Sequence, residues 1–343
     1  MGRIFRQIRT RGRPRTEGDM KSFKIVLIIL ISILALSTSG FSASKRVITI
    51  YTSGVGGTAY IIGGGIAKVL NKYLPEFQAM VEATGGTIAT VRFIAEKYEK
   101  KQEALGLSDS QGLYFAYTGK APFTRKYEMI RAITFVYGSG VNLVVPKNSP
   151  IKSYADLKGK VVAIGPAGSG LAEMSMDLIA AHGVTKQMFK YIYLGFKEVP
   201  EGIQDGSIDA GFVAGSFPVP ALRELSTTKE IRIVPVDEMV LKKMLVESPF
   251  FSMDILKPGA YKGVEKETPI LVFGIPLETH TACDTELIYR ITKTLFDHRD
   301  ELIEVHPIAK EMSFENAMKS IAFPIHPGAE KYFKEVGVIK TSK

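Results

Sequence analysis

The chain has 343 residues, of which 45% are hydrophobic and 23% are charged, and it contains one cysteine and no tryptophan. This composition is typical of a folded globular protein of one or two domains and excludes a disordered or collagen-like chain. Only one stretch approaches the apolar length of a membrane span, which excludes a polytopic membrane protein. Because Cys283 is the only cysteine, the chain forms no intrachain disulfide and no cysteine-based zinc site.

The positive charge of the chain is concentrated at its N-terminus. The formal net charge is +9, and residues 1–44 hold eight of the 44 basic residues and two of the 35 acidic ones. The rest of the chain therefore carries 36 basic and 33 acidic side chains, a net charge of +3. It contains no long run of lysine or arginine that would mark a phosphate-binding footprint, so we expect no nucleic-acid partner.

Residues 1–44 have the order of an export signal: basic residues first, an apolar stretch at 25–36, then small residues. We expect cleavage after Ser42 or a residue or two later. Because Met20 begins a compact signal of its own, we interpret residues 1–19 as an upstream extension from a misplaced start at Met1. An uncleaved membrane anchor is the alternative, although twelve apolar residues fall short of the ~20 that a span needs. Either way, we expect the body of the protein in the periplasm.

From residue 46 onward, short β-branched runs end in glycine-rich turns and lead into segments with helical spacing, which favours an α/β architecture. The first strand is predicted at 47–51 and the second at 77–82, each followed by an amphipathic helix. The third strand ends at Leu107 and leads into a helix that Ser108, Asp109 and Ser110 are suited to cap.

The α/β pattern restarts after a polar, proline-containing stretch at 145–160 (VPKNSPIKSYADLKGK), where we place the first domain crossing. A strand at 161–164, a turn and a helix at 171–182 follow it. The run TPILVFGIPL resembles a second crossing strand, and the C-terminal part is helical in pattern. We therefore expect two α/β lobes, with lobe I formed by residues 45–142 and 273–343 and lobe II by residues 143–272.

Three predicted turns pair glycine with a hydroxyl residue at the start of a helix: Gly56-Gly57-Thr58, Gly85-Gly86-Thr87 and Gly168-Ser169-Gly170. Unpaired first-turn N–H groups and the helix dipole suit a carboxylate or phosphate there. Ligands of α/β sheets bind beyond the carboxyl ends of the strands, where these turns are predicted to lie. Ordinary helix capping is the alternative for each turn taken singly.

Enzyme and cofactor signals are weak. Gly54, Gly56 and Ala59 match a dinucleotide fingerprint, but an exported protein has little access to nicotinamide cofactors, so we expect no cofactor. None of the glycine turns is a Walker loop, and no G-x-S-x-G elbow is present. The five histidines lack the spacing of a zinc site. Asp109 suits a general base, but it is explained equally well as a helix cap.

At these motifs the chain resembles the TAXI family, the TRAP-associated extracytoplasmic solute receptors. The resemblance runs across nearly the whole length after the leader. Its motifs are SGVGGTAYIIGGGIAKVLNK, EATGGTIATVRFIA, LSDSQGLYFAYTG, ADLKGKVVAIGPAGSG, DGSIDAGFVAGSFPVPALREL and PIHPGAEKYFKEVG. The chain departs from the family pattern at four positions in the expected cleft, which puts the ligand more in doubt than the fold: Ala59, Thr87, Thr90 and Leu107.

The resemblance implies a type II periplasmic binding protein fold, with two α/β lobes joined by crossing hinge strands. It implies a receptor, not an enzyme, that closes on a small organic acid or amino acid and delivers it to a TRAP-type permease. A glutamate-like amino acid or a dicarboxylate is the expected solute, and a monomer is the expected state. Two alternatives stay open: a sensing receptor for a signalling partner, and an exported enzyme on the same scaffold.

The expected ligand site combines the three glycine turns with neighbouring polar and aromatic side chains. Backbone N–H and hydroxyl groups of the turns are expected to hold a carboxylate. Tyr60 and Phe217 are expected to shield it, and Asp109 to meet an ammonium or hydroxyl group of the ligand. The full set is Gly57, Thr58, Tyr60, Thr84, Gly86, Thr87, Asp109, Gly168, Ser169, Gly170 and Phe217.

Overall fold

The computed structural model describes residues 45–55 and 57–340. The predicted export signal, its cleavage position and the start at Met1 or Met20 all lie outside the described residues. Residues from Arg46 onward form one compact unit. No described helix combines the length and the apolar character that crossing a bilayer requires.

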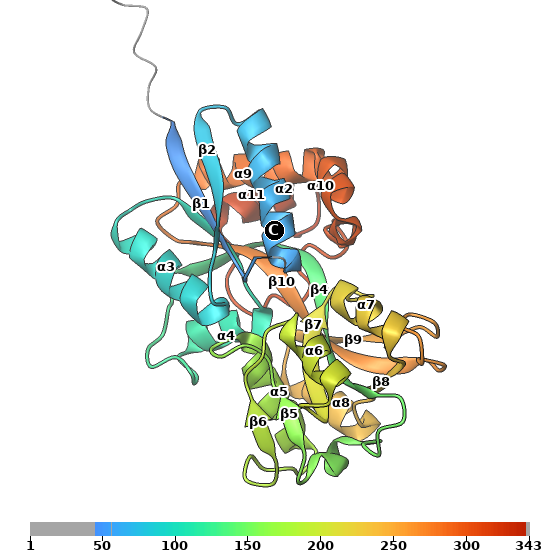
Figure 1. The fold of residues 1–343 in the computed structure, drawn as a ribbon. Coiled ribbons are helices and arrows are strands. Elements are labelled where there is room, and N and C mark those ends of the chain that lie inside the picture. The colour runs from blue at the N-terminus through green and yellow to red at the C-terminus, as the bar shows by residue number, and fades with distance from the viewer. Residues whose placement is uncertain (1–44, 56, 341–343) are drawn as a thin grey trace, which may run out of the picture. The chain divides into compact units, whose positions relative to one another are not determined.

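Strands and helices alternate along this unit as the sequence pattern predicts (Figure 1). The strands are β1 Arg46–Thr52, β2 Phe77–Ala83, β3 Ala104–Leu107, β4 Ile130–Pro146, β5 Val161–Ala163, β6 Lys190–Ile192, β7 Ala210–Gly215, β8 Ile231–Val234, β9 Phe251–Leu256 and β10 Thr268–His280. The α-helices are α2 Thr58–Tyr73, α3 Thr87–Glu99, α4 Ser110–Thr118, α5 Gly170–Ala181, α6 Glu198–Asp205, α7 Pro220–Thr228, α8 Glu238–Glu247, α9 Thr285–Asp297, α10 Arg299–Val305 and α11 Pro327–Glu335. Two 3-10 helices are η1 Tyr154–Leu157 and η2 Pro307–Glu311.

The hydrophobic periodicity of the sequence explains why these helices pack on the sheet. On α2, the apolar side chains that recur at helical spacing are all buried: Ile62, Ile66, Val69 and Leu70. The stripe of α9 is buried in the same way: Leu287, Ile288, Ile291 and Leu295. Each helix therefore covers the sheet with its apolar face and leaves its polar face outside, as expected for an α/β protein.

One sheet runs through both halves of the unit, in the order β2-β1-β3-β10-β4-β7-β5-β6, with β8 paired to β4 and β9 to β10. β1 is parallel to β2 and β3, and β5 is parallel to β6 and β7. β4 and β10 are antiparallel to each other and to their other neighbours. The predicted fold is confirmed: two α/β lobes joined by two crossing strands, here called lobe I (β1–β3 side) and lobe II (β5–β9 side).

The chain passes from lobe I to lobe II within β4, which corrects our placement of the first crossing in the stretch 145–160. Residues 130–140 of β4 pair with β10, and residues 140–144 pair with β7. The polar stretch instead lies on lobe II, where the Lys147 N–H donates to the Glu230 carbonyl (2.9 Å). The predicted lobe boundaries, 142/143 and 272/273, both fall inside the crossing strands.

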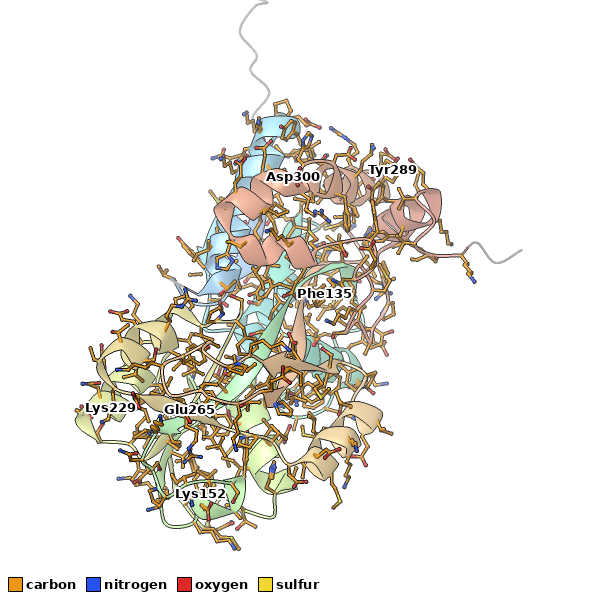
Figure 2. The ribbon with its side chains drawn as sticks, turned by 90° about the vertical axis from the view of Figure 1, so that its right-hand side faces the viewer. Phe135, Lys152, Lys229, Glu265, Tyr289 and Asp300 are labelled. Carbon is orange, nitrogen blue, oxygen red and sulfur yellow. The ribbon has the colours of Figure 1, made fainter. Side chains whose placement is uncertain are left out.

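The core is continuous across the crossing. One cluster of buried side chains joins Ile50 and Leu105 of lobe I through Val136 on β4 to Val162 and Phe212 of lobe II. Figure 2, turned by 90°, shows Phe135 on β4 between Tyr289 and Asp300 at one end and Lys152, Lys229 and Glu265 at the other. The crossing strands are therefore part of the packed interior rather than an exposed linker.

Candidate functional site

The carboxyl ends of β1, β2 and β3 meet at one edge of the lobe I sheet, because these strands are parallel and adjacent. Each strand leads into a helix that begins within six residues: α2 at Thr58, α3 at Thr87 and α4 at Ser110. In lobe II, β5 leads in the same way into α5 at Gly170. The topology thus gathers several helix N-termini at the edge where α/β proteins bind ligands.

Asp109 connects two of these N-termini. As the N-cap of α4 it accepts a hydrogen bond from the Gly112 N–H (2.6 Å), and its other carboxylate oxygen accepts one from the Thr87 hydroxyl of α3. The side chain is buried, and burial raises the pKa of Asp109 above its usual range, against the opposing effect of these hydrogen bonds. A buried carboxyl therefore lies between the starts of α3 and α4.

Lobe II touches lobe I at this carboxyl. A Cβ atom added to Gly170, the first residue of α5, would stand 2.1 Å from Asp109 Oδ2. A Cβ on Gly86 would lie 3.4 Å from the Cα of Ser169, and Gly86 has a φ of +116°, which disfavours any other residue. Glycine at these positions thus permits the close approach of α3, α4 and α5. The structure brings together six residues of the predicted set: Gly86, Thr87, Asp109, Gly168, Ser169 and Gly170.

Most of the predicted hydroxyl groups already have partners inside the protein. Thr84 donates to the Thr52 carbonyl (2.8 Å) and accepts from the Gly86 N–H (3.0 Å). Ser169 donates to the Pro166 carbonyl (2.7 Å) and caps α5. These hydroxyls fix the shape of the turns. The N–H groups of Gly57, Gly86 and Ser169 also donate inside the protein, so the donors left for a ligand lie among the residues that open each helix.

The start of α2 is open. Among the described residues, no side chain caps α2 or α3, whose N-caps are Gly57 and Gly86. Thr58 and Tyr60, in the first turn of α2, are both partly exposed. The Phe217 ring packs on a crossing strand, since a Cβ on Gly140 of β4 would stand 1.8 Å from it.

Two adjoining spaces of different size lie between the lobes. The space beside Thr87, Asp109 and Gly170 amounts to about 10 Å³, which is room for about one water molecule. A larger groove of about 280 Å³ adjoins it. The groove, here called the α4 groove, is lined by Gln111, Tyr114, Phe115, Lys120, Asp177, Met244, Glu247, Ser248, Phe250 and Phe251.

Sequence reasoning missed the α4 groove. Gln111, Tyr114 and Phe115 stand at i, i+3 and i+4 on α4, a spacing that places them on one helix face, and that signal was present in the sequence. Their partners in lobe II were not foreseeable, because Asp177 lies 66 residues beyond Gln111. The Gln111 amide donates to the Asp177 carboxylate (2.9 Å), a hydrogen bond between the lobes.

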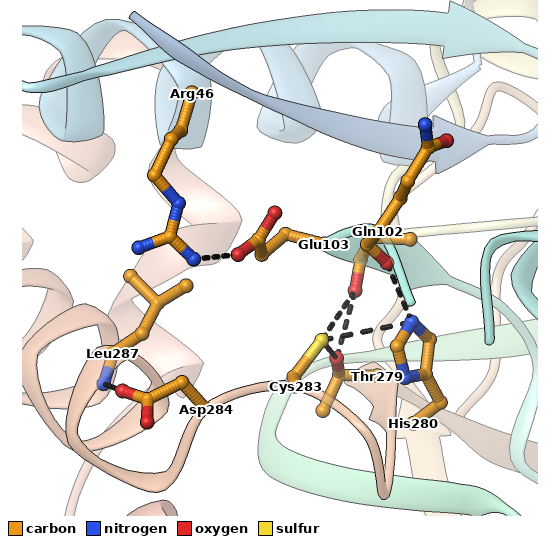
Figure 3. Close-up of polar contacts among 9 residues, drawn as sticks. Arg46, Gln102, Glu103, Thr279, His280, Cys283, Asp284 and Leu287 are labelled. Atoms are coloured by element: carbon orange, nitrogen blue, oxygen red, sulfur yellow. Dashed lines mark hydrogen bonds and ion pairs between the residues drawn. The ribbon is translucent and has the colours of Figure 1, made fainter. Parts of the chain in front are cut away.

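Cys283 and His280 have the side chains of a nucleophile and a base, but they lie at the edge of the sheet opposite the strand carboxyl ends. Cys283 Sγ is 3.7 Å from His280 Nε2, but that nitrogen is also 2.9 Å from the Gln102 carbonyl (Figure 3). The pair adjoins the amino end of β3, at Ala104, and is buried. It is therefore remote from the strand carboxyl ends and from both spaces described above. Within the described residues, no group of three or more His, Cys, Asp or Glu is arranged to hold a metal ion.

Several solved structures resemble this chain, and one of them reaches a TM-score above 0.5. A structure described as a periplasmic transporter is 15% identical, with a TM-score of 0.51 over 86% of this chain and 94% of that chain. The periplasmic aliphatic sulphonate binding protein SsuA from Escherichia coli is 14% identical over 85% of this chain and 84% of its own (TM-score 0.41). A TctC solute binding protein from Polaromonas is 16% identical over 77% and 88% (TM-score 0.46).

At such identities the first of these likenesses shows a shared fold and nothing about the ligand. The match to a protein-family model is more extensive, since the model of the NMT1-like family covers residues 50–337. That span contains nearly every described strand and helix, including the turns between the lobes. The chain belongs to the NMT1-like family.

Proposed function

We infer that the protein is an extracytoplasmic solute receptor that captures a small organic acid or amino acid between its lobes and delivers it to a TRAP-type permease. Within the NMT1-like family, the TAXI receptors are the group that the motifs of the chain resemble. The receptor acts in the periplasm as a monomer, after export by its N-terminal signal. It carries no cofactor and performs no reaction on the solute.

The observation that carries the proposal is the convergence of helix N-termini from both lobes. α3 and α5 begin against each other at Gly86 and Ser169, and α4 begins beside them at Asp109. First-turn N–H groups have no intrahelical acceptor, and the helix dipole adds a partial positive charge there. In the described arrangement the space beside them holds about one water molecule, so a solute enters when the lobes separate. Donors from both lobes then favour closure on its carboxylate.

Two side chains are assigned roles on the solute. Thr58 lies in the first turn of the uncapped helix α2, so its hydroxyl and the nearby N–H groups are available to a carboxylate oxygen. Asp109 Oδ1 and Oδ2 each accept one internal hydrogen bond, and a carboxylate oxygen can accept a second one. Asp109 is therefore the group that meets an ammonium or hydroxyl of the solute.

The proposal is tested by calorimetric titration of small carboxylates into the protein and into the double variant Thr58→Ala, Ser169→Ala. We expect the double variant to bind the best carboxylate at least tenfold more weakly. Because Ser169 also caps α5, Ser153→Ala, which removes the cap of η1 elsewhere in lobe II, is the matched control. Equal affinity in the double variant and the wild type would show that neither the Thr58 hydroxyl nor the turn shaped by Ser169 holds the carboxylate.

The permease partnership needs a separate test. In vesicles that contain a reconstituted TRAP permease, adding the liganded receptor should start solute uptake driven by an ion gradient without ATP. Uptake that is unchanged when the receptor is omitted would contradict the assigned partner while leaving solute binding intact.

A further inference from the structure

The α4 groove contains a chemistry that the carboxylate proposal does not use. Its floor is a cluster of aromatic rings contributed by both lobes. The Phe250 ring centroid lies 5.3 Å from that of Tyr114 and 5.9 Å from that of Phe115, in an edge-to-face arrangement with the latter. Phe251 extends the cluster at 4.7 Å from Phe250. Such a floor favours an apolar or aromatic body.

Hydrogen bonds between the Ser110 side chain and the backbone hold this floor in place. The Ser110 hydroxyl donates to the Phe250 carbonyl (3.0 Å) and accepts from the Gly274 N–H on β10 (3.0 Å). Ser110 is fully buried. It connects α4 of lobe I to the residue that precedes β9 in lobe II and to the crossing strand β10. The groove is therefore shaped before a ligand enters, which lowers the entropy cost of binding.

One wall of the groove carries oxygen atoms that can accept hydrogen bonds from an ammonium group. Asp177 lies there, and partial burial raises its pKa above the usual range, an effect that a cationic partner would reverse. Gln111 is 3% exposed, and its amide oxygen is buried without a hydrogen-bond partner among the described residues. The Gln111 amide nitrogen donates to Asp177, so the two residues are held together with an unused acceptor. Glu247 adds a second carboxylate to the lining.

The groove also contains one cation. Lys120 Nζ lies 5.2 Å from the centroid of the Tyr114 ring and 5.8 Å from that of Phe115. Against Asp177 and Glu247 it leaves the lining with one net negative charge. A plain amine would meet repulsion from Lys120, and a plain carboxylate would meet repulsion from the two acids. A molecule with both charges satisfies the lining best.

We propose that the α4 groove is a second ligand seat, distinct from the glycine turns, for a free α-amino acid with an apolar or aromatic side chain. The ammonium group lies against Asp177 and the unpaired oxygen of Gln111, and the carboxylate pairs with Lys120. The side chain lies on Phe250 and Phe251. The groove volume of about 280 Å³ is at the small end for ligand pockets, which suits a single amino acid and excludes a peptide.

Both lobes line this seat, so its occupation has a consequence for the receptor. Gln111, Tyr114 and Lys120 belong to lobe I, and Asp177 and Phe250 belong to lobe II. An amino acid that contacts both sets stabilises the closed arrangement. Binding in the groove should therefore strengthen the binding of a carboxylate at the glycine turns, and the reverse coupling must be equal.

The test uses calorimetric titration of the purified protein with L-phenylalanine, 2-phenylethylamine and 3-phenylpropionate, which share one ring and differ in charge. L-Phenylalanine should bind most tightly. Asp177→Asn keeps an acceptor for Gln111 and should weaken L-phenylalanine and 2-phenylethylamine about tenfold, the loss of one charge-assisted contact. Lys120→Gln should weaken L-phenylalanine and 3-phenylpropionate about as much, but not 2-phenylethylamine.

Asp300→Asn in lobe I and Lys152→Gln in lobe II remove the same charges at positions outside the groove lining and are the matched controls. Thermal unfolding of each variant without ligand checks that it is folded. The proposal is overturned if L-phenylalanine does not bind, or if Asp177→Asn and Lys120→Gln bind all three compounds like the controls. Carboxylate binding that depends on Thr58 and Ser169 would survive either result, so the two proposals fail separately.

Discussion

Glu278 lies on the crossing strand β10 with no exposed surface, next to the carboxyl end of β3. One oxygen accepts a hydrogen bond from the Ser108 N–H (3.2 Å), and the other has no partner among the described residues. Burial raises the pKa of Glu278 to about 8, with hydrogen bonds from Ser108 opposing the shift and Asp109 adding to it. We predict that Glu278→Gln stabilises the protein at neutral and alkaline pH.

The sign and size follow from linkage. The folded pKa of about 8 exceeds the ordinary value of 4.5, so between these values the folded state binds more protons than the unfolded state. Stability therefore falls as pH rises through this window, by roughly 1 kcal/mol per pH unit from this group. Between pH 5 and pH 7 the wild type should lose roughly 2 kcal/mol of stability that the glutamine variant, which does not titrate, keeps.

Urea unfolding at pH 5, 6, 7 and 8 measures this difference, followed by circular dichroism or tyrosine fluorescence because the chain has no tryptophan. Groups other than Glu278 cancel in the comparison of wild type and variant. Glu201→Gln, at an exposed position on α6, is the control for the change from glutamate to glutamine itself. A Glu278→Gln difference that stays constant from pH 5 to pH 8 would refute the reasoning.

Three further predictions concern other buried contacts. Burial lowers the pKa of His326 to about 4, so the unfolded state takes up a proton below pH 6.5 and is favoured there. The free energy of unfolding measured in urea should fall by roughly 2 kcal/mol between pH 6.5 and 4, and His326→Asn should not show this fall. Gly140→Ala should destabilise by about 2 kcal/mol or more because its Cβ would stand 1.8 Å from the Phe217 ring, and adding Phe217→Ala should recover part of that loss in denaturant titrations. Gly170→Ala places a Cβ 2.1 Å from Asp109 across the two lobes, and separation of the lobes relieves this clash. Calorimetry should therefore show weaker solute binding while the unfolding midpoint changes little; a lost fold with the same affinity in the remaining folded protein would contradict this.

The strand and helix pattern was predictable because each element buries a stripe or a run of its own side chains. The stripes of α2 and α9 are local properties of 13 to 16 residues, and so are the caps at Asp109 and Ser169. The glycine turns were predictable for the same reason, since parallel strands place successive turns at one edge of the sheet.

The first half of β4 was not predictable from its sequence. Gly138 and Gly140 interrupt the apolar run, and isolated glycine in a strand pattern usually weakens that interpretation. Contacts with residues distant in the sequence explain why glycine stands at these positions. A Cβ at Gly140 would collide with Phe217, and one at Gly138 would lie 2.9 Å from Val272. β9 was missed because it gains its partner only when β10 lies beside it.

The partners of the site hydroxyls were also beyond local reasoning. The contact of Thr87 with Asp109 spans 22 residues, and it turns an expected ligand donor into a structural one. The contact of Gln111 with Asp177 joins two lobes and depends on how they close. The sequence pattern therefore located the edge of the sheet where a ligand is expected. Which side chains there are bonded inside the protein and which are left for a ligand could be seen only in the folded structure.

The account's central claim, capture of a small carboxylate between two lobes, is tested most directly by a thermal-unfolding screen against organic acids, amino acids, sugars and cations. Any copurified ligand is first removed by partial unfolding and dialysis. A carboxylate at ~100 times its dissociation constant should add about 2.7 kcal/mol and raise the unfolding temperature by several degrees. Shifts are expected from carboxylates, and none from sugars. Shifts from sugars or cations alone, with none from any acid, would contradict the claim.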